Sequence, residues 1–236
     1  MAKKIPYGLT DYFRIVTEDF YYVDKTKYIE DLEKTAAFLF LIRPRRFGKS
    51  LFLNMLNCYY DVKYADRFEE LFGNQYIGKH PTAEQGKYLV LRFNFSMVRA
   101  TDDKLEAAFN RHISLETAYF ASVYASYFKP DFQEQLKLIP EAAGRLEYIC
   151  LCAKEQGLSI YLLIDEYDNF TNTILSSKGN DVYHSLTHDS GFYRSFFNVV
   201  KGVTTGAEAP VKRMFITGVS PVTLDDVTRG FNIGTN

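Results

Sequence analysis

The sequence predicts an α/β domain built on a mostly parallel sheet with helices on both faces. Short apolar runs, typical of strands buried on both faces, alternate along the chain with segments of helical periodicity. A Gly-Lys-Ser tripeptide follows the first of these runs, and further polar residues follow two later ones. Because ligands of such sheets bind at the carboxyl ends of the strands, we expect a functional site at that edge.

Four apolar runs are the predicted strands. The first, "AAFLFLI", shows no alternation of polar and apolar residues, as expected of a strand covered on both sides. The second and third are "KYLVLRFNFS" and "SIYLLID", and the fourth is "VKRMFITGV". In residue numbers these runs are 36–42, 87–96, 159–165 and 211–219.

Segments with helical spacing lie between the predicted strands. After the first run, Leu51, Met55 and Cys58 recur at helical intervals. Gly157 is placed to end a helix in the left-handed conformation. Residues 171–190 are polar, and we expect a loop there. Further helices are predicted at 25–34 with Asp24 as cap, at the start of 63–87, over 102–127, 131–156 and 191–202, and from "TLDDVTRG" onward.

Composition limits the classes of function. The chain has 236 residues, of which 47% are apolar, enough for one large core. Its 28 basic residues balance 29 acidic ones, which excludes a dedicated nucleic-acid binder of strongly basic character. The 3 cysteines show no disulfide framework, which indicates a reducing compartment. With neither an apolar leader nor a long apolar run, we expect a cytoplasmic location and no membrane contact.

The segment "LFLIRPRRFGKSLFLNML" has the order of a phosphate-binding loop: strand, loop, Gly48-Lys49-Ser50, helix. Backbone N–H groups at a helix start can hold phosphate oxygens, Lys49 would reach the terminal phosphates, and Ser50 would bind Mg²⁺. The usual first Gly of the motif is replaced by Arg43, whose backbone the following proline pushes toward extended geometry. On its own, the tripeptide is common enough that a solvated basic turn is the simpler explanation.

A second motif favours the phosphate-binding loop over the solvated basic turn. In "IYLLIDEYDN" an apolar strand ends in two adjacent carboxylates, Asp165 and Glu166. Next to a phosphate loop, the first would hold Mg²⁺ through water and the second would activate a water as general base. The alternative is an ordinary turn with a helix cap, which explains Asp168 and Asn169 well but Asp165 and Glu166 less well.

The third motif is "MFITGVSP", where a strand ends at Thr217. A polar group at that point could sense the γ-phosphate, as in AAA-type ATPases, although an ordinary hydroxyl at a strand end is an equally good explanation. One predicted strand, 87–96, lies along the chain between the loop and the Asp-Glu strand. Phosphate-loop enzymes with an additional catalytic Glu place a strand between those two in the sheet.

With these residues in hand, the sequence resembles a bacterial family of AAA-ATPase-like proteins. The matching motifs run in order from about Ile5 to Pro221, and in that family Arg43 is a usual part of the loop. They are "IPYGLTDYF", "YYVDKTKYIEDL", "IRPRRFGKSLFLNML", "YIGKHP", "LLIDEYDN" and "ITGVSP".

The resemblance implies a three-layer P-loop NTPase fold that uses ATP and Mg²⁺. We expect residues 1–35 to be an N-terminal lead-in segment and 36–236 to be an AAA-like P-loop NTPase domain. Full-length members commonly add a C-terminal nuclease-like domain of the PD-(D/E)XK type, so we expect this chain to be a fragment of a longer protein.

The implied roles are assigned residue by residue. Glu166, Lys49 and Thr217 are the candidate catalytic residues, and Ser50 and Asp165 are the candidate metal ligands. The candidate nucleotide-binding residues are Arg45, Arg46, Phe47, Gly48, Lys49, Ser50 and Leu51.

Three functions remain open. The first is a slow Mg²⁺-dependent ATPase that acts as a regulatory or signal-transducing switch, the second a non-hydrolysing interaction module, and the third the ATPase part of a nuclease-associated DNA-processing protein. A homo-oligomer is one expectation, since many such ATPases take an arginine from a neighbour, and Arg194 and Arg229 are the candidates. The protein partner is not identified, and direct nucleic-acid binding is not expected. His184 and His188 lie one helical turn apart, but lack an evident third ligand for a metal.

Overall fold

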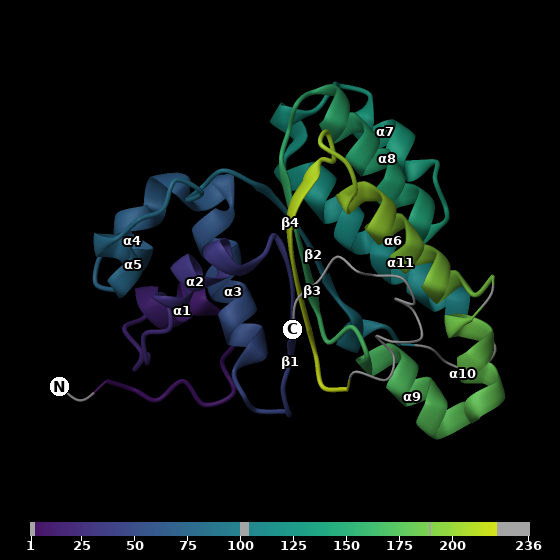
Figure 1. Cartoon of the computed structure of the whole chain (residues 1–236), viewed down its shortest axis with the longest axis horizontal. Coiled ribbons are helices and arrows are strands. Elements are labelled where there is room, and N and C mark those ends of the chain that lie inside the picture. The colour runs from purple at the N-terminus through teal and green to yellow at the C-terminus, as the bar shows by residue number, and fades with distance from the viewer. Residues whose placement is uncertain (1–2, 100–103, 189, 221–236) are drawn as a thin grey trace.

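The computed structural model describes residues 3–99, 104–188 and 190–220. Within them, four strands form one sheet in the order β1-β4-β3-β2, and every neighbouring pair is parallel. The strands are β1 (Phe38–Ile42), β2 (Leu89–Asn94), β3 (Ile160–Asp165) and β4 (Val211–Gly218). The predicted parallel α/β sheet is therefore confirmed (Figure 1).

Helices cover both faces of the sheet (Figure 1). One face carries α1 (Tyr12–Thr17), α2 (Tyr28–Thr35), α3 (Lys49–Tyr60), α4 (Phe68–Phe72) and α5 (Tyr76–Lys79), with a 3₁₀ turn η1 (Val62–Arg67) after α3. The other face carries α6 (Leu105–Val123), α7 (Phe132–Lys137), α8 (Ala142–Glu155), α9 (Asn169–Lys178), α10 (Asn180–Thr187) and α11 (Phe192–Thr204).

The apolar strands divide their side chains between two cores. In β3, Leu162 and Ile164 pack with the α6, α8 and α11 layer, whereas Tyr161 and Leu163 pack with the α3 layer. Every residue of β3 is buried. A strand covered on both sides cannot alternate polar with apolar residues, which explains the continuous apolar runs in the sequence.

The strand between β1 and β3 is β4, and β2 lies at the edge of the sheet. A strand was expected at that central place, but chain order pointed to 87–96. The chain instead forms β2 and β3 outward of β4 and returns to the centre with its last described strand. This places the end of β4, with Thr217, directly between the ends of β1 and β3.

The prediction of a loop over 171–190 was wrong, because α9 and α10 occupy most of it. Asn, Ser and Thr residues dominate the exposed sides of these helices, so the sequence looks like a loop although each helix has a narrow apolar face. On that face Phe170, Ile174 and Leu186 join the core. Gly179, with φ +84°, separates the two helices.

Two further predicted helices differ in their extent. The single helix expected over 131–156 is two helices, α7 and α8, which are separated around Pro140, where the ring prevents continuous helical hydrogen bonding. The helix expected over 102–127 is α6 followed by a short 3₁₀ turn, η3 (Ala125–Tyr127). The predicted stop at Gly157 is confirmed, with φ +65° just past α8. The segment "TLDDVTRG" lies outside the described residues.

The lead-in segment packs on α3. The predicted helix is confirmed as α2, but Asp24 does not cap it. One Asp24 oxygen accepts from the N–H and hydroxyl of Thr26, and the other accepts from the N–H of Tyr76 in α5. The prediction looked only at the nearest helix, whereas this carboxylate joins two segments that are distant in sequence. Whether residues 1–35 form a separate segment stays a prediction.

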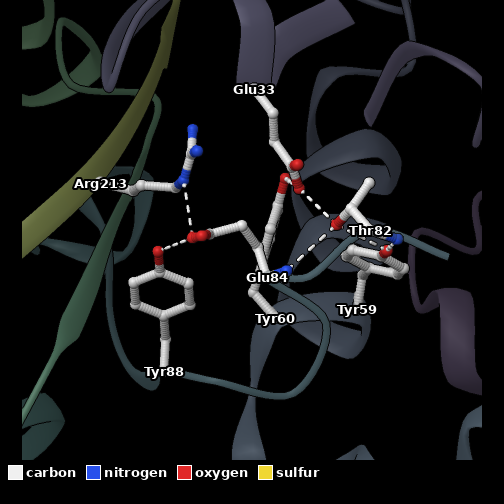
Figure 2. Close-up of polar contacts among 7 residues, drawn as sticks. All are labelled: Glu33, Tyr59, Tyr60, Thr82, Glu84, Tyr88 and Arg213. Atoms are coloured by element: carbon white, nitrogen blue, oxygen red, sulfur yellow. Dashed lines mark hydrogen bonds and ion pairs between the residues drawn. The ribbon is translucent and has the colours of Figure 1, made fainter. Parts of the chain in front are cut away.

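A polar network beside the amino ends of β2 and β4 also ties α2 to the rest of the fold, and Figure 2 shows its side chains. Glu33 accepts hydrogen bonds from the hydroxyls of Tyr60 (2.9 Å) and Thr82 (2.8 Å). Beside it, Glu84 accepts from Tyr88 and from Arg213 of β4.

The described part of the chain contains no helix long and apolar enough to cross a bilayer.

Candidate functional site

The carboxyl ends of the four strands lie along one edge of the sheet. In the register, Ile42 of β1 pairs with Gly218 of β4, and Asn94 of β2 pairs with Asp165 of β3. The three predicted motifs follow β1, β3 and β4, so the fold brings them to this common edge. This confirms that they are neighbours, as expected for a parallel sheet.

The Arg43–Gly48 loop connects β1 to α3. Two of its residues have left-handed backbone: Arg46 with φ +68° and Gly48 with φ +78°. That conformation costs little for glycine and is uncommon for arginine. The N–H of Arg43 donates to the carbonyl oxygen of Gly218 (3.1 Å), so the loop is attached to the end of β4 from its first residue.

The Lys49 side chain is hydrogen-bonded to the backbone of the Arg43–Gly48 loop. Its ammonium donates to the carbonyl oxygens of Arg43 (2.9 Å) and Pro44 (3.1 Å), and the residue is only 6% exposed. The backbone carbonyls thus hold a buried positive charge beside the start of α3. The helix start also concentrates free N–H groups, so both features favour an anion.

The other predicted nucleotide-binding residues differ in exposure. Arg45, Arg46 and Phe47 are exposed, and Phe47 retains 68% of its accessible surface. Ser50 and Leu51 are half-buried in the first turn of α3. The predicted residues are therefore contiguous around one loop and helix start.

Asp165, Glu166 and Thr217 form one hydrogen-bonded joint between β3 and β4. The Thr217 hydroxyl donates to Oδ1 of the buried Asp165 and accepts from the N–H of Glu166 (3.3 Å). No described residue donates a hydrogen bond to Oδ2 of Asp165. This hydroxyl therefore orients the carboxylate that sequence analysis assigned to a metal.

Glu166 has φ +53°, in the left-handed region, which turns the chain sharply away from β3. Burial and the neighbouring Asp165 raise the pKa of its carboxyl, whereas the positive charges of Lys49 and Arg45 act in the opposite direction. Both Glu166 and Arg45 line a cavity of about 220 Å³. The Arg43–Gly48 loop and the end of β3 thus act on each other electrostatically.

Asp168 and Asn169, which the sequence analysis explained as a turn and helix cap, both make side-chain contacts around the ends of β3 and β4. The buried Asp168 accepts from the N–H groups of Val219 (3.1 Å) and Ser220 (2.7 Å), although it stands at the cap position of α9. Asn169 donates to Oε2 of Glu166 (3.2 Å). The capping explanation was wrong for the Asp168 side chain, which clamps the turn after β3 to the turn after β4.

Gly218 lies where the turns meet. A Cβ on this residue would come within 2.6 Å of Cδ1 of Tyr167 and closer still to Cε1. The N–H of Tyr167 donates to the carbonyl oxygen of Thr217 (3.0 Å), and its hydroxyl donates to the carbonyl oxygen of Ser220, so both ends of this residue are attached next to Gly218. The only sequence signal for this packing was a glycine directly at the end of an apolar strand.

Comparisons with known proteins give the family of the chain. Residues 6–228 match the family model described as "Predicted AAA-ATPase". The chain belongs to this family. It is 26% identical over 238 residues to the "Uncharacterized protein in vnfD 5'region" of Azotobacter chroococcum mcd 1, an alignment that covers 98% of this chain and 40% of that protein. The chain thus spans well under half the length of this relative. No solved structure matches the chain.

Arg194 and Arg229 were the sequence-based candidates for an arginine that a neighbouring subunit would receive. Arg194 lies half-buried on α11 and does not line the cavity beside Glu166. Arg229 lies outside the described residues. The assignment of such an arginine stays a prediction.

The histidine pair has no further metal ligand beside it among the described residues. His184 is on α10 and His188 follows its end, with their Nδ1 atoms 3.2 Å apart. The solvated loop expected there is instead helical. Among the residues that the structure describes, no group of three or more His, Cys, Asp or Glu side chains could hold a metal.

Proposed function

We propose that this chain binds ATP with Mg²⁺ at the carboxyl edge of its sheet and hydrolyses it slowly to ADP and phosphate, as a regulatory or signal-transducing switch. The observation that carries the proposal is the joint of Thr217, Asp165 and Glu166 beside Lys49. It collects an anion-binding helix start, two carboxylates and a polar strand end at one place. Family membership supports nucleotide use in general.

The donor set fits Mg²⁺. This ion prefers oxygen ligands and retains several waters, so it needs few protein groups. Asp165 keeps one carboxylate oxygen clear of hydrogen bonds from described residues, because Thr217 donates only to the other. Ser50 adds a hydroxyl in the first turn of α3. When bound, the ion would neutralise phosphate charge between these two residues.

Glu166 is the proposed general base. Its carboxyl is half-buried, and burial raises its pKa, which brings it closer to that of a useful base. Asn169 holds one of its oxygens, leaving the other to accept a proton from water. Lys49 and Arg45 supply positive charge to the same space, where charge develops on a transferred phosphoryl group.

The test uses calorimetry with ATP and Mg²⁺, followed by a phosphate-release assay. Glu166→Gln should retain binding and lose turnover, while Lys49→Ala should lose binding. Glu134→Gln and Lys154→Ala are matched controls on exposed helix surfaces and should behave like the wild type. Turnover that survives in Glu166→Gln contradicts the role of this residue.

The same assay separates the alternative functions. Binding without phosphate release at any protein concentration favours a non-hydrolysing interaction module. In that case the hydrogen bond from Asn169 would hold the Glu166 carboxylate in a position where it does not act as a base. A DNA-processing role would need a nuclease-like domain in addition to the residues of this chain. Strong, salt-dependent DNA binding by the chain itself would favour that role despite the net charge of −1.

A further inference from the structure

A second cavity of about 350 Å³ lies at the β2 edge of the sheet, separate from the cavity beside Glu166. Its walls come from α3, β2 and α6, with the start of α1 and the η1 turn at the rim. The volume is within the range of small-molecule sites, which begins at about 300 Å³. Polar and charged side chains contribute much of its lining, in contrast to an ordinary packing defect.

Four charged side chains line this cavity, and two already have partners. Asp11 accepts a backbone hydrogen bond at the start of α1, and Lys63 pairs with the buried Asp61 (3.5 Å). The remaining two are Arg92 of β2 and Glu116 of α6. Within the described residues, neither belongs to an ion pair with a charged partner.

Arg92 projects from β2 on the side that faces α3. One guanidinium nitrogen donates to Oδ1 of Asn54 (2.7 Å), which is a neutral partner. A guanidinium has five N–H donors arranged to hold a carboxylate through two parallel bonds. Its half-buried place on a strand is costly for a charge that no described carboxylate balances within 4 Å.

Glu116 faces the same cavity from α6. Nε2 of His112 lies 4.0 Å from Oε1 of Glu116, which is too far for a hydrogen bond. Burial lowers the pKa of His112, which favours the neutral imidazole, and its Nε2 has no hydrogen-bond partner among the described residues. Burial also raises the pKa of Glu116, and Arg92 is near enough to oppose that shift. The carboxylate and the guanidinium thus act on each other without touching.

We propose that this cavity binds a small zwitterion of the free α-amino-acid type, with its carboxylate on Arg92 and its ammonium on Glu116. A simple anion would be repelled by the Glu116 carboxylate, and a simple cation would be repelled by the Arg92 guanidinium. A ligand that carries both charges can pair with both side chains. The amides of Asn57 and Asn94 offer further hydrogen bonds, and Tyr64 lines the cavity beside them.

Hydrogen bonds also connect the cavity to the first turn of α3, which follows the Arg43–Gly48 loop. Asn54, which accepts from Arg92, donates from its own amide to the carbonyl oxygen of Ser50 (2.8 Å). A ligand that draws on Arg92 therefore acts through Asn54 on the first turn of α3. This coupling rests on the proposed nucleotide function, whereas binding of the amino acid does not. If the amino acid changes the affinity for ATP by some factor, ATP must change the affinity for the amino acid by the same factor.

The experiment begins with the nucleotide-free chain. Each of the standard free amino acids is added singly at millimolar concentration, and the midpoint of thermal unfolding is measured. A ligand that binds only the folded state stabilises it by RT ln(1 + L/Kd), where L is the ligand concentration, so this midpoint rises with the logarithm of the ligand concentration once that concentration exceeds the dissociation constant. At least one amino acid should do so, and its N-acetyl and amide derivatives, which each lack one charge, should not.

Variants then test the two walls by calorimetry with the amino acid that binds. Arg92→Gln and Glu116→Gln should each weaken binding about tenfold or more, as expected for the loss of a charge-assisted hydrogen bond. Arg111→Gln and Glu106→Gln remove the same charges from exposed positions on α6 and should leave affinity unchanged. Circular dichroism and the unfolding midpoint without ligand report whether each variant is folded, and Arg92→Lys supplies a charge-retaining second variant.

Three results would overturn the proposal: no amino acid shifts the midpoint, the N-acetyl derivative binds as well as the free amino acid, or folded Arg92→Gln and Glu116→Gln bind like the wild type. A parallel titration with ATP and Mg²⁺ keeps the two functions apart. Amino-acid binding with no ATP binding would contradict only the nucleotide function. ATP binding with no amino-acid binding would contradict only this inference.

Discussion

Gly218→Ala tests how closely the turns after β3 and β4 are packed. The added Cβ would lie within 2.6 Å of Cδ1 of Tyr167 and 3.0 Å from Oδ1 of Asp168. Neither neighbour can move freely, because Tyr167 is fully buried and Asp168 holds the N–H groups of Val219 and Ser220. Overpacking of this kind costs about 1–3 kcal/mol of unfolding free energy. Gly218 does not have a positive φ, so the loss would come from packing rather than backbone strain.

Urea unfolding followed by circular dichroism measures this loss, with an unchanged slope as evidence that only stability changed. Gly202→Ala is the matched control, since it lies exposed within α11 and a Cβ there meets nothing within 4 Å. It should gain about 0.5–1 kcal/mol from lower backbone entropy in the unfolded chain. A Gly218→Ala variant as stable as the wild type would refute the close packing of the two turns.

Three further substitutions probe the site and the cavity. Asp168→Ala leaves two N–H groups of the turn after β4 without their acceptor, and urea unfolding should show a loss of about 1–3 kcal/mol. Tyr124→Phe removes the hydroxyl that accepts from the N–H of Val90 (3.1 Å), with a similar loss that the exposed Tyr127→Phe should not share. Glu116→Gln should gain in stability over the wild type as pH rises from acid to neutral. Burial raises the pKa of Glu116 above 4.5, so its contribution is full below that value and falls as the folded carboxyl ionises. Equal pH dependence of the two proteins would contradict this direction.

The sequence predicted the elements whose signals are local. Strands buried on both faces produce uninterrupted apolar runs, and all four were located within a few residues. Gly157 ended its helix as expected because a left-handed glycine is itself a local signal. The helices α9 and α10 were missed since their apolar faces are narrow and their remaining residues are typical of turns.

The candidate site was predicted in its parts but not in its connections. Lys49, Asp165 and Thr217 were chosen because each stands at a strand end or helix start, which sequence patterns reveal. The clamp by Asp168 and the packing at Gly218 depend on contacts between residues about 50 positions apart, which no local pattern records. The order of the strands was not predictable for the same reason.

The central claim is that one MgATP site spans the Arg43–Gly48 loop and the ends of β3 and β4. A structure of the chain with a non-hydrolysable ATP analogue and Mg²⁺ tests it most directly. We expect the terminal phosphates to lie against Lys49 and the start of α3. The metal should lie between Ser50 and Asp165, and Glu166 should face the γ-phosphate. An analogue bound elsewhere, or a metal that contacts neither Ser50 nor Asp165 directly or through water, would contradict it.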